Sequence, residues 1–62
     1  MNRHDIFTII KKLALSQGFY SSIYCKLVEM KENDILSYNK VMETLEKQNF
    51  KDSLDLVLYF ET

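Results

Sequence analysis

The sequence predicts an all-α protein, a compact bundle of four short helices in one domain over residues 1–62. Three observations support this prediction. Apolar residues recur at helical spacing along most of the chain, the chain contains no proline and one glycine, and it has no repeat, low-complexity tract or linker. Because the expected connections are short, neighbouring helices are expected to pack antiparallel.

The first helix is expected over about residues 3–16. Asn2 or Asp5 is placed to cap its start, where a side-chain oxygen can accept a backbone N–H. Gly18, the single glycine, is expected to close this helix in the left-handed conformation that glycine adopts without strain. The apolar face is formed by residues at helical spacing, namely Ile6, Ile9, Ile10 and Leu13.

The second and third helices are expected over about residues 20–32 and 35–48. Asp34 lies directly before the third helix and is placed as its N-cap, and Asn49 can end that helix in the left-handed conformation. The inward positions of the second helix are Tyr20, Ile23, Tyr24, Leu27 and Met30. Those of the third helix are Tyr38, Val41, Met42 and Leu45.

The last segment, expected as a helix over 53–61, is apolar on nearly every side. Periodicity alone does not separate a buried strand from a buried helix here. A helix is favoured because a single strand would have no partner, and because Asp52 is placed as an N-cap. Asp55 is expected to cap the first turn of the same helix. Two roles stay open for this helix: the centre of the core, or a surface that meets a partner.

Charge and composition exclude several partners. The chain carries eight basic and nine acidic residues, a net charge of −1, and the two signs are interspersed. Attraction to nucleic acid or anionic lipid is therefore not expected. No apolar run approaches the ~20 residues of a membrane span, and the first residues lack a secretory pattern. With a free cysteine, these features indicate the cytoplasm.

No catalytic, metal or nucleotide motif stands out, so we expect neither an enzyme nor a cofactor. His4 is the only histidine, and near a chain end it is expected to be a solvated surface group. Cys25 lacks the neighbouring base that a nucleophile needs and is expected to be a half-buried structural thiol. The two residues together supply half of the ligands of a structural zinc site.

The candidate contact surface for a protein partner consists of surplus apolar and aromatic side chains. Its members are Leu56, Tyr59 and Phe60 in the last helix, with Phe19 and Tyr20 near the start of the second. The last helix is also a candidate seam for a homodimer. An alternative interpretation assigns a nucleic-acid-binding role to exposed lysines, namely Lys11, Lys12 and Lys26.

Three blocks of the sequence resemble a type of very short protein found in prophages and mobile elements of low-GC Gram-positive bacteria. They are LALSQGFY at 13–20, KEND at 31–34 and QNFKDSLDLVLYFE at 48–61. The blocks mark helix boundaries and core. The resemblance implies a context in which small accessory proteins bind host or phage proteins, including inhibitors of bacterial defence such as anti-CRISPR proteins.

The leading hypothesis is a small non-enzymatic phage or mobile-element protein that binds and inhibits or modulates a larger host protein in the host cytoplasm. A bacterial defence system such as CRISPR-Cas is one candidate target. The alternative hypothesis is a small dimeric nucleic-acid-associated regulator that pairs through its last helix.

Overall fold

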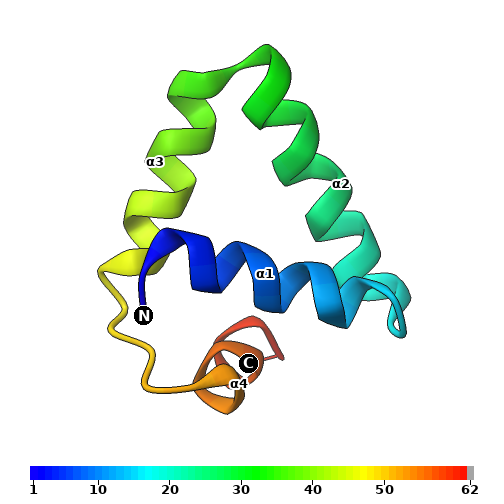
Figure 1. Ribbon diagram of the computed structural model, residues 1–62, viewed down its shortest axis with the longest axis vertical. Helices are drawn as coiled ribbons and strands as arrows, with labels where there is room; N and C mark the ends of the chain where they lie inside the picture. The colour runs from blue at the N-terminus through cyan, green and yellow to red at the C-terminus, as the bar shows by residue number, and fades with distance from the viewer. Residues whose placement is uncertain (62) are drawn as a thin grey trace.

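The computed structural model of this protein describes residues 1–61 and confirms the predicted all-α four-helix bundle. In Figure 1 the first three helices form the sides of a triangle, and the fourth lies below α1. Within the described residues there is no β-strand. The helices are α1 (Arg3–Ala14), α2 (Gly18–Asn33), α3 (Ile35–Glu46) and α4 (Ser53–Glu61).

The N-caps of α1 and α3 form as predicted. The Asn2 side chain accepts a hydrogen bond of 2.9 Å from the backbone N–H of Asp5. The Asp34 carboxylate accepts one from the backbone N–H of Ser37 at 3.2 Å and another from the Ser37 hydroxyl at 2.7 Å. These bonds, the hydroxyl first, lower the pKa of Asp34 below its ordinary value because they favour the ionised carboxylate.

The turn from α3 into α4 also follows the prediction. Asn49 adopts a left-handed conformation with φ 54°, which reverses the chain after α3. At the start of α4, Asp52 accepts a hydrogen bond from the Asp55 N–H at 3.1 Å, and Asp55 accepts one from the Lys51 N–H at 3.0 Å. Asp52 therefore caps the start of α4 as predicted, and the Asp55 carboxylate holds the backbone just before the helix in a variant of the capping box.

The turn between α1 and α2 differs from the prediction. Gly18 does not adopt a positive φ and is the first residue of α2. The carbonyls at the end of α1 are instead satisfied by tight backbone turns: the N–H of Leu15 donates to Lys12 at 3.2 Å, and that of Gln17 donates to Leu13 at 3.0 Å. Because these bonds close the helix, no left-handed residue is required.

A single apolar core lies where the four helices meet. α1 packs against α2 and α3, which also pack against each other. Within α4 the buried residue is Leu56, whose side chain has no exposed surface. The core therefore ties the shortest helix to the other three. Its buried members are Ile6, Ile10, Leu27, Tyr38, Met42, Leu45, Phe50 and Leu56.

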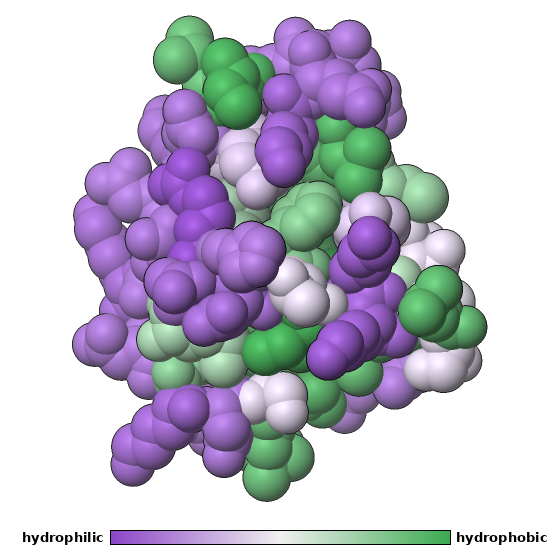
Figure 2. All heavy atoms as spheres, viewed as in Figure 1, coloured by the Kyte–Doolittle hydropathy of each residue, from purple (hydrophilic) through white to green (hydrophobic). Residues whose placement is uncertain are grey.

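The surface is as small as that of an ordinary monomer. Its accessible area of 4391 Å² is close to the roughly 4200 Å² expected for a monomer of this mass. On the face drawn in Figure 2, hydrophilic side chains dominate the left side, over α3, and apolar side chains emerge in separate groups. Among the described residues, none of the helices combines the length and the apolar character that crossing a membrane requires.

We expect Gly18→Ala to raise the free energy of unfolding by about 0.4–1 kcal/mol, because alanine restricts the unfolded chain more than glycine does. A Cβ atom at this position would meet no atom within 4 Å. Asn49→Ala is the matched control and should lower stability by about 1 kcal/mol, since alanine disfavours a left-handed backbone. Urea denaturation measures both. Equal destabilisation by the two variants would indicate a left-handed Gly18.

We expect Leu56→Ala to destabilise the protein by about 2–5 kcal/mol, because it leaves a cavity at a fully buried position. Leu58→Ala, on the same helix at a position 52% exposed, should change stability by less than about 0.5 kcal/mol. Chemical denaturation compares the pair. If Leu56→Ala does not fold, Leu56→Met keeps the volume and should cost less than about 1.5 kcal/mol. Equal effects at both leucines would place Leu56 outside the core.

Candidate functional site

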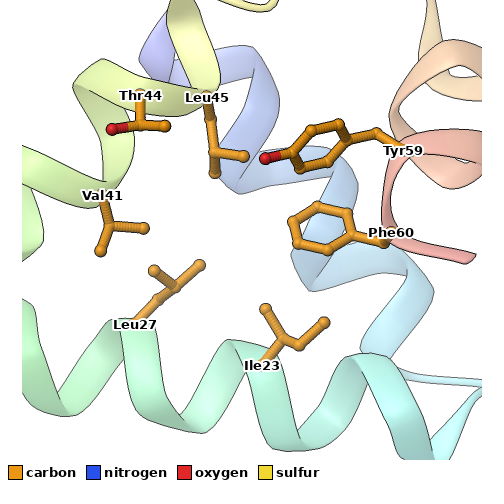
Figure 3. A pocket seen from close by; sticks show the side chains of 7 residues that line it. All are labelled: Ile23, Leu27, Val41, Thr44, Leu45, Tyr59 and Phe60. Carbon is orange, nitrogen blue, oxygen red and sulfur yellow. The ribbon is translucent and has the colours of Figure 1, made fainter. Parts of the chain in front are cut away.

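An apolar groove with a volume of about 270 Å³ opens between α2, α3 and α4. In Figure 3 the labelled side chains face a common space, and the ribbon of α1 passes behind it. Apart from the hydroxyls of Thr44 and Tyr59, the lining side chains carry no polar atom. The groove residues are Ile23, Leu27, Val41, Thr44, Leu45, Tyr59 and Phe60.

Helical spacing places these residues on the walls of the groove. Side chains four positions apart share one face of a helix, as Ile23 and Leu27 do on α2 and as Val41 and Leu45 do on α3. The Thr44 hydroxyl donates to the Lys40 carbonyl at 2.9 Å, and Figure 3 shows it directed away from the other labelled side chains. The Thr44 hydroxyl is therefore satisfied by a hydrogen bond within α3, and the α3 wall of the groove is apolar.

The groove has a buried floor and an accessible rim. Leu27 and Leu45 retain only 3% and 5% of their surface, so they form the floor. Val41 is 37% exposed and Tyr59 is 42% exposed, on opposite sides of the space in Figure 3. The prediction that Val41 points into the core is thus wrong in part. It lines the groove and remains partly exposed there.

A chain of aromatic rings continues from the α4 wall of the groove. Ring centroids are 5.2 Å apart for Phe19 and Tyr20, 6.0 Å for Tyr20 and Phe60, and 5.4 Å for both Phe60 and Tyr59 and for Tyr59 and Phe50. Each pair packs edge to face, the geometry that ring quadrupoles favour. We call these five residues the aromatic row. It brings together four of the residues predicted to bind a partner.

The structure corrects the role of two predicted contact residues. Leu56 and Tyr20 have no exposed surface, so in the folded monomer neither can form the outer face of a binding site. Leu56 fills the core beneath α4, and Tyr20 is covered by the packing of Phe60 across its ring. Of the other predicted contacts, Phe19 is 54% exposed, Tyr59 is accessible and Phe60 is half-buried.

Tyr20 carries the one polar side-chain atom that is buried without a partner among the described residues. Its hydroxyl lies in the interior and makes no hydrogen bond. Burial, and next the charge of Glu61, raises the pKa of Tyr20 above its ordinary value of 10.0. Both effects penalise the phenolate, so the hydroxyl stays neutral at physiological pH. The unpaired hydroxyl is a cost that the packing of the aromatic row offsets.

The remaining sequence candidates lie apart from the groove. Lys11 and Lys12 are exposed on α1, and Lys26 is exposed on α2 beside the acidic Glu29. Cys25 is exposed, which corrects the expected half-buried thiol: its position on α2 faces away from the core cluster. His4 is exposed as well. Within residues 1–61 no group of three His, Cys, Asp or Glu side chains is arranged to hold a metal ion.

No family model, curated protein or solved structure matches this chain. The groove and the aromatic row are therefore the observations that bear on function. The sequence pattern marked Ile23, Leu27 and Leu45 as core but could not show that their outer edges line an opening. Thr44 carried no signal, because a threonine on a helix looks like any polar surface residue.

We expect Tyr20→Phe to leave the free energy of unfolding unchanged or to raise it by up to about 1 kcal/mol, because it removes a buried unpaired hydroxyl. The raised pKa means that the folded state favours the neutral phenol. The contribution of the neutral Tyr20 side chain to the free energy of unfolding is therefore fully present below pH 10.0. It is lost as the pH rises through the pKa of Tyr20 in the folded protein.

Urea denaturation at neutral pH and at alkaline pH tests this prediction, with Tyr24→Phe as the control because that residue shows no comparable burial. The advantage of Tyr20→Phe over the unmodified protein should grow as the pH increases past 10.0. A loss of more than about 1 kcal/mol at neutral pH would show that the hydroxyl has a hydrogen-bond partner.

Proposed function

We propose that this chain is a small non-enzymatic binding protein whose groove receives apolar side chains from a larger protein partner. The observation that carries the proposal is the combination of an apolar floor at Leu27 and Leu45 with an accessible rim at Val41 and Tyr59. Interfaces between proteins commonly place an apolar anchor in such a recess, with aromatic residues around it.

The size of the groove favours side chains over a small-molecule ligand. Sites for drug-sized molecules enclose roughly 300–1,000 Å³ and bury most of the ligand surface. The groove, at about 270 Å³, lies below that range, and its rim residues Val41 and Tyr59 remain exposed. A projecting apolar side chain from a partner needs less volume and arrives with its own surrounding surface, which covers the exposed rim.

The charges on α3 beside the groove add little to binding. Glu43 and Lys47 form an ion pair at 3.6 Å, with both side chains largely exposed, so their charges offset each other. Burial of Val41 and Tyr59 against a partner supplies the favourable term. Because only 37% and 42% of their surface remains exposed, each contributes a fraction of the about 1.5–3 kcal/mol that complete burial of a large apolar side chain contributes. Binding at this groove is therefore expected to depend weakly on salt.

The resemblance to mobile-element proteins extends the proposal to the kind of partner. In that context the partner is a host protein, and a bound chain of this size inhibits or modulates it by covering part of its surface. A bacterial defence system such as CRISPR-Cas is one candidate. This extension rests on the sequence blocks at 13–20, 31–34 and 48–61.

We expect Val41→Asp to weaken binding of the partner at least about tenfold, because it brings a carboxylate into an apolar recess that the partner must desolvate. Leu36→Asp is the matched control: the same substitution type on the same helix, at a position 79% exposed and outside the groove. Both positions are accessible, so circular dichroism should report unchanged helicity for the two variants.

The measurement is affinity capture from a nuclease-treated lysate of a low-GC Gram-positive host, followed by titration of the captured protein. A protein held by the unmodified chain and by Leu36→Asp, but not by Val41→Asp, supports the proposal. Loss with both variants, or with neither, contradicts it. Recovery of nucleic acid alone before nuclease treatment, or of a second copy of the chain, favours the alternative regulator.

A further inference from the structure

A second hollow lies away from the groove, where the start of α1, the end of α2 and the first half of α3 meet. Its volume is about 460 Å³, and it shares no lining residue with the groove. Basic and aromatic side chains line it together, and no acidic side chain does. Its lining residues are Arg3, His4, Phe7, Lys31, Ile35, Tyr38 and Asn39. We call it the basic hollow.

Lys31 places a positive charge over two aromatic rings of the basic hollow. Its ammonium nitrogen lies 5.0 Å from the centroid of the Phe7 ring and 6.0 Å from that of Tyr38. No carboxylate among the described residues forms an ion pair with it. The carboxylate of Asp34, three residues further on, instead accepts hydrogen bonds from Ser37. The charge of Lys31 is thus held in place and is not neutralised.

Two hydrogen bonds fix Arg3 beside the Tyr38 ring. Its Nε donates to Glu46 at 2.7 Å and its Nη1 donates to the side-chain oxygen of Asn39 at 2.8 Å. The guanidinium carbon lies 5.9 Å from the centroid of the Tyr38 ring. The second terminal nitrogen, Nη2, has no hydrogen-bond partner among the described residues. Arg3 therefore keeps a donor in a preorganised position.

The charges and the apolar surface together define a ligand class. Glu46 offsets the charge of Arg3, so Lys31 leaves the equivalent of one uncompensated positive charge. Ile35 is 50% exposed and, with Phe7, offers an apolar surface next to that charge. A phosphate, with nearly two negative charges at neutral pH, would need more donors than Lys31 and Nη2 provide. A single carboxylate matches them.

We propose that the basic hollow binds a single carboxylate carried on an aromatic or aliphatic body. The carboxylate accepts hydrogen bonds from the Lys31 ammonium and from Nη2 of Arg3. The apolar body lies on Ile35 and Phe7. This site is independent of the groove, so the proposal stands or fails separately from the proposed protein partner.

The test is an NMR titration of the intact chain with phenylpropanoate, a carboxylate on an aromatic body, and in parallel with inorganic phosphate. Phenylpropanoate should give saturable shifts of the Phe7, Ile35 and Asn39 amides, with a dissociation constant on the order of 1 mM. Lys31→Gln should weaken binding about fivefold. Lys12→Gln, the control at an exposed lysine outside the basic hollow, should leave the affinity unchanged.

Four results would overturn the proposal. The first is no saturable shift up to about 10 mM phenylpropanoate. The second is equal weakening by Lys31→Gln and Lys12→Gln. The third is saturable shifts of the amides of groove residues such as Ile23 and Thr44, with no such shifts in the basic hollow. The fourth is tighter binding of inorganic phosphate at the same amides, which would replace the ligand class.

Discussion

The burial of Leu56 is the interaction on which the groove of this protein depends. It holds α4 against the other helices, and α4 then supplies Tyr59 and Phe60 as one wall of the groove. α4 is the shortest helix of the bundle, and isolated helices of this length are not stable in water, so α4 depends on its packing and is supported by the Asp52 cap. The groove is therefore a product of tertiary packing.

The arrangement also shows how so short a chain remains folded. It cannot form an internal disulfide, and it buries one continuous core. Where α1 meets α3, Arg3 joins Glu46 and Asn39 and fixes the two helices in register. In the aromatic row, edge-to-face packing tolerates the unpaired hydroxyl of Tyr20. Local imperfections of this kind persist where the surrounding contacts outweigh them.

The two hollows differ in the physical term that dominates each. Removal of apolar surface from water governs the groove, and that term is nearly independent of salt. The charge of Lys31 dominates the basic hollow. Because Lys31 is exposed, its attraction for an anionic ligand would weaken as ionic strength rises. One small bundle therefore has an apolar groove and a basic hollow, and ligands proposed for the two would respond differently to ionic strength.

The sequence by itself determined the helices, most of their caps and most of the core, because periodicity, Asn2, Asp34, Asn49 and Asp52 act over a few residues. Tertiary structure decided the rest. It placed Gly18 at the first position of α2, since backbone turns had already closed α1. It also decided which apolar positions stay open. Leu56 and Tyr20 are buried while Val41 is accessible, because the exposure of a side chain depends on which elements pack against it, and no local pattern encodes that packing.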